Sequence, residues 1–129
     1  MRFRALAPLM TVVALTGVLG TAPSASAGAA GSAEEFCGVK AHDNRLWCGN
    51  AADAPTRYAP YHESSFSGLL MTSYSWFDCF AFGGWHGGNN ATWYHTTPDW
   101  GDPGYIPADW VNTPPSFDAN PQAYGLRPC

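Results

Sequence analysis

Positive charge is scarce in this sequence. Its 129 residues include six Lys and Arg against ten Asp and Glu, and two of these cations, Arg2 and Arg4, lie at the extreme N-terminus. The rest of the chain has four cations against ten acids, which gives a formal net charge of −6. Nucleic acids and anionic membrane surfaces are bound through clustered basic side chains. We therefore expect neither of them as a partner.

A hydrophobic run long enough to span a bilayer is missing as well. The longest apolar stretch, residues 5–20, has about 16 residues, whereas a spanning helix needs about 20. This stretch follows Arg2 and Arg4 and precedes Ala25-Ser26-Ala27, an order typical of a secretory signal. We expect residues 1–27 to be a signal peptide, no membrane association after its removal, and a secreted, extracellular product.

Spacings that would indicate a metal site or an active site are absent from the sequence. It has no C-x2-C pair, no H-E-x-x-H motif and no nucleophile elbow. Side chains that could in principle form a metal site or an acid/base pair are His86, His95, Asp99 and Asp102. A Ser/His/acid arrangement could be sought among His62, Glu63, Ser64 and Ser65. We expect instead that the aspartates cap a turn and that the histidines face solvent or bind backbone carbonyls, with no metal, no cofactor and no enzymatic activity.

Cysteine is present in small number, but its distribution is informative. All four cysteines lie after residue 27, and an even number in an exported chain indicates a disulfide framework. A domain of about 100 residues buries only about two thirds of its surface, so such bridges add needed stability. Three pairings are possible, and spacing alone does not select one. We favour Cys37 with Cys48, closing a short N-terminal loop, and Cys79 with Cys129, tying the end of the chain to a strand.

The remaining pattern predicts an all-β fold. The most apolar stretch after the signal is rich in Tyr, Trp, Phe, Thr and Ser, which favours strand over helix. The expected order is a hairpin turning at 42–44, a strand at 69–82, a glycine-rich connection at 83–90, a strand at 92–96, a turn at 99–104 and a strand at 104–106. The tail that follows is rich in proline, so we expect it to be extended and irregular, with no helix of useful length.

Aromatic side chains are the best candidates for a binding site. Flat rings give a large contact area at a small entropic cost, and they suit peptide or sugar faces. The same rings would also serve a small hydrophobic core, so each candidate has a structural alternative. Trp85 and Trp100 lie in polar loop sequence, which makes them the pair that we expect to be exposed. The candidate ligand-binding residues are Trp85, Trp100, Trp76, Tyr105 and Trp110.

A series of short aromatic and glycine-containing segments runs through residues 58–111. Its members are Tyr58-Ala59-Pro60, Ser64-Ser65-Phe66, residues 69–82, Trp93-Tyr94, residues 101–104, Gly104-Tyr105-Ile106 and Trp110-Val111. This series resembles the bacterial SH3-like (SH3b) domain, and the chain resembles small exported bacterial proteins built on that core with cysteines at comparable places. The resemblance implies a small SH3-like β-barrel over residues 56–112, preceded by the disulfide hairpin in residues 28–55 and followed by a Pro-rich tail, residues 113–129, that a disulfide ties back.

The resemblance also bears on function. SH3-like domains are mostly non-catalytic and dock cell-wall peptides or other proteins through an aromatic-lined groove. We expect a monomeric secreted module that recognises a peptide or a cell-wall component through exposed aromatic side chains. An inhibitor or partner protein of an exported hydrolase is one alternative, because a rigid loop such as residues 83–90 or 99–104 could enter the cleft of another protein. A small exported hydrolase is the other.

Overall fold

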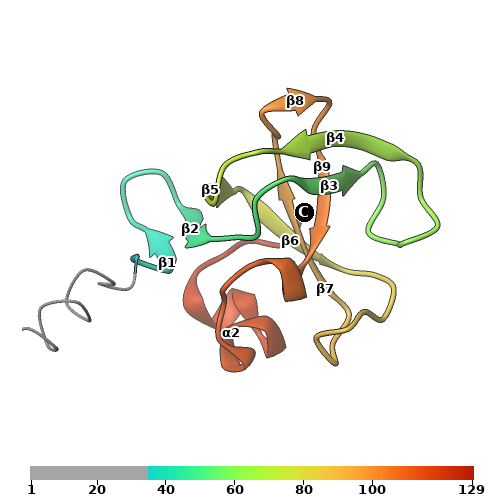
Figure 1. The fold of residues 1–129 in the computed structure, drawn as a ribbon. Coiled ribbons are helices and arrows are strands. Elements are labelled where there is room, and N and C mark those ends of the chain that lie inside the picture. The colour runs from blue at the N-terminus through green and yellow to red at the C-terminus, as the bar shows by residue number, and fades with distance from the viewer. Residues whose placement is uncertain (1–34) are drawn as a thin grey trace, which may run out of the picture. The chain divides into compact units, whose positions relative to one another are not determined.

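The fold consists of short strands in two antiparallel sheets (Figure 1). The structure, a computed structural model, describes residues 35–129, so the expected signal peptide lies outside the described residues. The smaller sheet has the order β1 (Gly38–Lys40), β2 (Arg45–Gly49) and β5 (Tyr74–Phe77). The larger sheet has the order β6 (Cys79–Phe82), β7 (Thr92–Thr96), β9 (Gly104–Pro107), β3 (Ala54–Arg57), β4 (Phe66–Leu70) and β8 (Trp100–Gly101). The expectation of an all-β fold is confirmed.

The expected closed barrel is wrong, because both sheets are open. In the larger sheet β6 and β8 form the two edges. The strand β8 has only two residues and pairs with β4. The outer edge of β6 is already occupied by the end of the chain, where Pro128 pairs with Phe80. Closing the larger sheet into a barrel would require β6 to pair with β8, and the edge of β6 is not free for that pairing.

The stretch from residue 69 to residue 82 is divided between the two sheets instead of forming one strand. Its first residues end β4, its middle is β5 beside β2, and its end is β6 beside β7. The first break is made by the Asp99 carboxylate, which accepts hydrogen bonds from the N–H groups of Met71 and Thr72 at 2.7 and 3.1 Å. At the second break, Asp78, the single residue between β5 and β6, donates its N–H to the His95 carbonyl. Both partners come from further along the chain, so local strand propensity does not reveal the breaks.

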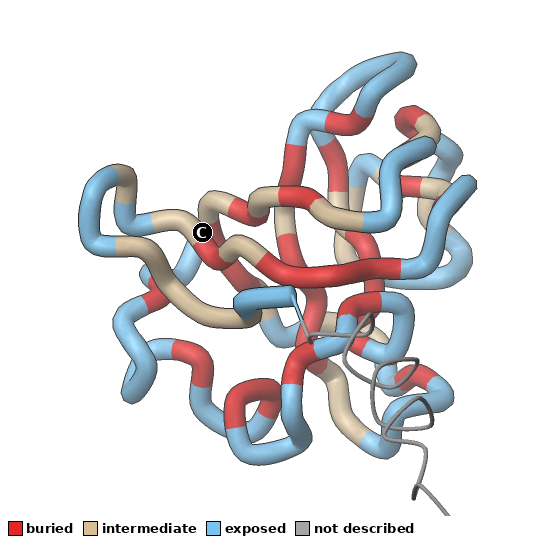
Figure 2. The backbone as a smooth tube through the Cα atoms, turned by 60° about the vertical axis from the view of Figure 1, so that its left-hand side comes forward, coloured by how far each residue is buried: buried red, intermediate tan, exposed pale blue. Residues whose placement is uncertain are grey.

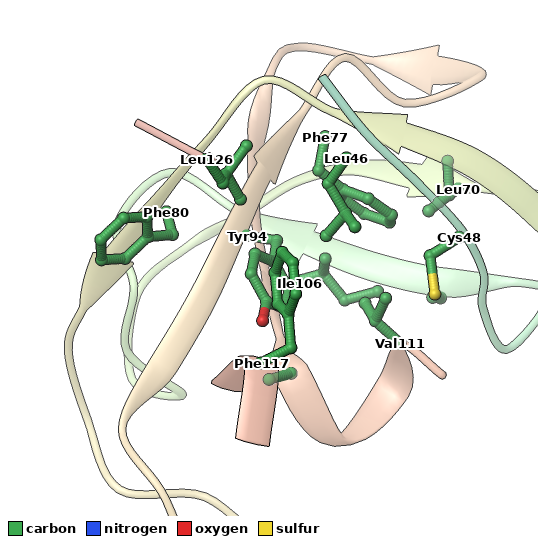
Figure 3. Packing of buried hydrophobic residues seen from close by; sticks show 12 residues of the cluster. Leu46, Cys48, Leu70, Phe77, Phe80, Tyr94, Ile106, Val111, Phe117 and Leu126 are labelled. Carbon is green, nitrogen blue, oxygen red and sulfur yellow. The ribbon is translucent and has the colours of Figure 1, made fainter. Parts of the chain in front are cut away.

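The hydrophobic core lies between the two sheets and the C-terminal segment. Buried and half-buried residues alternate along β3 and β5, while exposed residues concentrate in the loops (Figure 2). Phe77 and Tyr94, from different sheets, meet with ring centroids 5.9 Å apart. Burying side chains of this size stabilises the fold by roughly 1.5–3 kcal/mol each. The core includes Leu46, Cys48, Leu70, Phe77, Phe80, Tyr94, Ile106, Val111, Phe117 and Leu126 (Figure 3).

Strands β1 and β2 form the N-terminal hairpin that the sequence predicts. Asn44 in its turn has φ 55°, a left-handed conformation that Asn tolerates. The Asp43 carboxylate accepts hydrogen bonds from the backbone N–H of Arg45 at 3.0 Å and from the indole N–H of Trp47 at 2.9 Å. Because β2 also pairs with β5, the hairpin is an integral part of the smaller sheet.

Both disulfides favoured from the sequence are present. Cys37–Cys48 joins the chain before β1 to β2, and Cys79–Cys129 joins β6 to the last residue of the chain. The N–H of Cys129 also donates to the Phe80 carbonyl at 2.8 Å. The end of the chain is therefore fixed along β6 by a covalent bond and by backbone hydrogen bonding.

The tail is more regular than the sequence predicts. It contains the helix α2 (Pro115–Ala119) and the 3-10 helix η2 (Pro121–Tyr124). Each begins with proline, which is favourable in the first turn because its missing N–H would have no helical partner there. The proline content that indicated an irregular tail thus marks the starts of two short helices. Within residues 35–129, no helix is long and apolar enough to cross a membrane.

A buried carboxylate fastens α2 to the larger sheet. Asp118 Oδ1 accepts hydrogen bonds from the Tyr94 and Thr113 hydroxyls, both at 2.5 Å. The Asp118 backbone carbonyl accepts a third from the Thr92 hydroxyl at 2.6 Å. Burial raises the pKa of Asp118, and burial together with the hydrogen bond to Asp118 raises the pKa of Tyr94. The tail is therefore packed on the sheet through a buried polar network as well as through apolar contacts.

Candidate functional site: the Trp100 arm

The five aromatic candidates are spread over the described part of the chain. Trp76 is on β5, Trp100 on β8 and Tyr105 on β9, while Trp85 lies in the β6–β7 loop and Trp110 ends the 3-10 helix η1 (Ala108–Trp110). None of the close ring pairs among residues 35–129 joins two of the five. Trp85 and Trp100 are the most exposed, at 69% and 61%, which confirms the expectation for this pair. Trp100 is on β8 at one edge of the larger sheet, and the loop that carries Trp85 follows β6 at the opposite edge.

Trp100 is carried by the connection between β7 and β9, residues 97–103, which we call the Trp100 arm (Figure 1). Within the arm, β8 pairs with β4. Asp99, just before Trp100, caps the turn between β4 and β5 with its carboxylate. Asp102, just after β8, donates its N–H to the Ser67 carbonyl at 2.9 Å. The backbone is thus fixed on both sides of Trp100, so little freedom is lost when the ring binds a partner.

Two glycines let the Trp100 arm approach β4 closely. Gly68 of β4 lies opposite Gly101 of β8. A Cβ at Gly68 would lie 2.3 Å from the Trp100 carbonyl oxygen, and one at Gly101 would lie 2.4 Å from the Ser67 carbonyl oxygen. Gly101 also has φ 93°, a conformation that is strained for other residues. The position of Trp100 therefore depends on both glycines.

Two further exposed rings accompany Trp100. The ring of Phe66, on β4, has its centroid 6.0 Å from that of Trp100. The hydroxyl of Tyr58, which follows β3, donates to Asp102 Oδ2 at 2.6 Å, and this hydrogen bond raises the pKa of Tyr58. Phe66 and Tyr58 are 47% and 54% exposed. Together with Trp100 they form an aromatic surface on one edge of the larger sheet.

Sequence reasoning missed Phe66 and Tyr58 as members of this surface. Phe66 stands between Ser65 and Ser67, a polar setting like the one that singled out Trp100. Applied to all aromatic residues, that criterion would have found Phe66. Tyr58 carries no such signal, because its place beside the Trp100 arm results from a hydrogen bond to a residue 44 positions away.

Trp85 is presented by a separate loop that a buried histidine orders. His86 Nε2 donates to the Thr92 carbonyl at 2.8 Å, and Nδ1 accepts from the Gly88 N–H at 3.1 Å. The Asp109 carboxylate also lies near this ring, with Oδ1 3.4 Å from Nδ1. The expectation that a histidine binds a backbone carbonyl is therefore confirmed for His86, which has a structural role beneath Trp85.

The closest carboxylate and imidazole pair is formed by Asp78 and His95. Asp78 Oδ1 lies 2.9 Å from His95 Nδ1, and the Cys79 sulfur lies within 4.8 Å of both groups. That sulfur is bonded to Cys129, so it offers no thiolate to a metal ion. Among residues 35–129, no hydroxyl is hydrogen-bonded to His95, as a Ser/His/acid mechanism would require. The pair joins the loop before β6 to β7.

The other acid/base candidates are not brought together in a reactive arrangement. The His62 ring packs edge-on against Trp93, with centroids 5.0 Å apart. The Ser64 hydroxyl accepts a hydrogen bond from the Ala59 N–H at 2.9 Å and so stabilises the β3–β4 loop. Asp99 and Asp102 hold backbone and hydroxyl groups of the Trp100 arm and its neighbours, as described above.

Comparison with known proteins gives no relative. The chain matches no protein-family model, no curated protein and no solved structure. The resemblance to SH3-like domains therefore stays a prediction from short aromatic segments, and the function is argued from the site itself.

Proposed function

We propose that this protein is a secreted binding module, without enzymatic activity, that binds a peptide or a cell-wall component through the Trp100 arm. The observation that carries the proposal is the presence of three exposed rings, Trp100, Phe66 and Tyr58, on a fixed backbone. Rigid aromatic side chains often supply most of the energy of an interface. Clustered exposed apolar side chains mark interaction sites in soluble proteins.

The charge near these rings favours a partner with cationic or apolar groups. Asp102 touches Tyr58, and Asp99 and Glu63 are exposed in the neighbouring loops. The guanidinium of Arg57 donates to the Ser64 carbonyl at 2.9 Å and is thereby held in the β3–β4 loop. An amino or guanidinium group of a peptide would be attracted by the ring faces and by the carboxylates. Secretion is supported by the two disulfides, which are typical of an oxidising compartment.

Co-sedimentation with insoluble bacterial cell wall tests this function. We expect the wild-type protein to sediment with the wall, and we expect Trp100→Ala and Phe66→Ala to weaken binding at least tenfold, the loss typical of a central aromatic residue. Phe82→Ala is the matched control, because Phe82 is also an exposed ring but belongs to β6 at the other edge. Retained disulfides and an unchanged unfolding midpoint would show that the variants are folded.

If the wild type, Trp100→Ala and Phe82→Ala sediment equally, the Trp100 arm is not the site that binds the wall. A wild-type protein that does not sediment would direct attention to a soluble peptide or protein. In that case the same three proteins would be compared on immobilised cationic peptides.

An inhibitor of an exported hydrolase is a second candidate, and the shape of the arm favours it. The arm places β8 at its tip, beyond β4 (Figure 1). Hydrogen bonds hold it on both sides of β8, through the Asp99 carboxylate and through the Asp102 N–H. A rigid protruding segment of this kind suits the cleft of a protease. The test adds the protein to secreted proteases and measures their turnover of substrate. Inhibition by the wild type and by Phe82→Ala, but not by Trp100→Ala, would support this function over wall binding.

A further inference from the structure

The outer face of the smaller sheet carries two cations on aromatic rings. The strand register places Lys40 opposite Arg45 and Trp47 opposite Trp76, and side chains that face each other lie on the same side of a sheet. The Lys40 ammonium lies 4.6 Å from the Trp47 ring centroid, and the Arg45 guanidinium lies 4.0 Å from that of Trp76. Tyr74 adds a third ring, 6.1 Å from Trp47. We call these five side chains the cationic aromatic face.

Positive charge is concentrated on this face although the chain is acidic. Residues 35–129 contain four cations, and two of them, Lys40 and Arg45, are direct cross-strand neighbours. Like charges placed opposite each other destabilise a sheet. Within the described residues neither cation forms an ion pair with a carboxylate. The Asp43 carboxylate accepts a hydrogen bond from the Trp47 indole N–H and attracts Arg45, but it does not reach ion-pair distance. The two adjacent positive groups therefore keep hydrogen-bond donors that an anionic ligand can use.

A hollow of about 250 Å³ adjoins the cationic aromatic face. Its lining includes Trp47, Tyr74 and Trp76 of this face, and Thr97 and Asp99 at the base of the Trp100 arm. The Asp99 carboxylate uses Oδ2 to hold the turn before β5. Rings, hydroxyls and a carboxylate acceptor beside two cations are groups that can bind both the apolar faces and the hydroxyls of a sugar.

The edge of β5 next to this hollow is not open to an added strand. The Trp76 carbonyl already accepts a hydrogen bond from the Thr96 hydroxyl at 2.7 Å. Just past the end of β5, the Asp78 N–H donates to the His95 carbonyl at 3.0 Å. A peptide that binds by strand addition needs these edge groups. Side chains, rather than backbone, must therefore recognise the ligand.

We infer that the cationic aromatic face and its hollow bind an acidic polysaccharide, whose anionic groups meet Lys40 and Arg45 while its sugar rings enter the hollow beside Trp47, Tyr74 and Trp76. Because the protein as a whole is negatively charged, general attraction to polyanions does not provide this binding. The site differs from the aromatic surface of Trp100, Phe66 and Tyr58. Asp99 lines the hollow as well as the base of the arm, so the anionic groups of the polysaccharide must lie toward Lys40 and Arg45 and only sugar hydroxyls toward this carboxylate. The exposed rings of the arm, in contrast, favour cationic or apolar groups.

The test measures binding of the full secreted chain to four polymers by titration calorimetry at low salt. Polygalacturonate supplies carboxylates and a phosphomannan supplies phosphates, so the two together distinguish the source of the anion. Pullulan is the neutral polysaccharide, and poly-glutamate is the acidic polypeptide. We expect binding to at least one of the two acidic polysaccharides, weakened by salt, and clearly weaker or no binding to pullulan and poly-glutamate.

Variants decide whether the binding is at this face. Lys40→Gln and Arg45→Gln should each lower the affinity about tenfold, as expected for one lost charge-assisted contact. Arg127→Gln removes the same charge elsewhere and should leave the affinity unchanged, and Trp100→Ala should also bind normally. The inference is overturned if neither acidic polysaccharide binds, if pullulan or poly-glutamate binds as tightly, or if Arg127→Gln has the same effect as Lys40→Gln. None of these results depends on whether the Trp100 arm binds cell wall.

Discussion

At the scale of single residues, Asp118 shows how one buried carboxylate can connect distant segments. Its Oδ1 serves as acceptor for Tyr94 on β7 and for Thr113 before α2. These hydrogen bonds favour the charged carboxylate, whereas burial opposes it, and burial has the larger effect because the pKa of Asp118 is raised. The native state therefore holds the Asp118 proton more tightly than the unfolded chain does.

This difference in proton binding predicts a pH dependence of stability. Between the unfolded pKa of Asp118, about 3.8, and its raised pKa in the native state, the folded protein binds more protons than the unfolded chain. The contribution of Asp118 to the free energy of unfolding is therefore fully present below the unfolded pKa and is lost as pH rises through the native pKa. Asp118→Asn keeps an oxygen acceptor for Tyr94 and Thr113 but does not titrate.

Urea unfolding of both proteins at a series of pH values measures the effect. We expect the free energy of unfolding of Asp118→Asn, minus that of the wild type, to increase as pH rises from about 4. A difference that stays constant or decreases over this range would show that the native state does not raise the pKa of Asp118.

Residue-scale reasoning from the sequence succeeded where the local context was decisive. Trp85 and Trp100 stand in polar sequence and are exposed. The favoured cysteine pairing is also confirmed, although spacing alone did not select it among the three possible ones. It failed for Tyr58, whose hydrogen-bond partner Asp102 comes from the Trp100 arm. Local context therefore predicts exposure better than it predicts which exposed side chains are neighbours.

At the scale of elements, the contact between β4 and β8 determines where the Trp100 arm lies. We predict that Gly68→Ala disrupts this contact, because the new Cβ would lie 2.3 Å from the Trp100 carbonyl oxygen. Overpacking of this kind costs about 1–3 kcal/mol. Hydrogen exchange of the Asp102 N–H, which donates to Ser67, should become faster, and the free energy of unfolding should decrease by that amount.

Gly38→Ala provides the comparison for this variant. A Cβ at Gly38 would meet the exposed Phe36 side chain at 3.2 Å, and that ring can move away. Exchange at Asp102 should be unchanged in Gly38→Ala. If both variants exchange at the wild-type rate, the close approach of β8 to β4 does not hold the arm in place.

The division of residues 69–82 into parts of three strands shows the limit of prediction at this scale. Residue content correctly indicated strand, but the breaks depend on Asp99 and on the His95 carbonyl. The same limit applies to the barrel, since closure depends on which edges are still free after the tail has paired with β6. The helices of the tail were missed because proline was interpreted as a helix breaker rather than as the first residue of a helix.

At the scale of the whole molecule, the two disulfides should contribute unequally to stability. Cys37–Cys48 closes a separation of 11 residues and Cys79–Cys129 one of 50. Loop entropy then predicts that replacing the first pair by serine lowers the free energy of unfolding by about 3 kcal/mol and replacing the second pair by about 4 kcal/mol. Urea unfolding of the two double variants measures both values.

Reduction of the wild-type protein is the control for these substitutions. A reductant should lower the melting temperature below that of either double variant, because it breaks both bridges. An unchanged melting temperature in reductant, or a larger loss from the hairpin pair than from the tail pair, would contradict this view of the bridges.

The open sheet has a consequence for how molecules of this protein meet one another. An unpaired strand edge is a template for another chain and can start aggregation. The β8 edge offers only two residues, and the β6 edge is covered by the end of the chain through Pro128 and the Cys129 N–H. The Cys79–Cys129 bond keeps that cover in place. The bond therefore also affects solubility. A reduced molecule can release the residues that follow the buried Leu126 and present β6 to a neighbour as the start of a fibril.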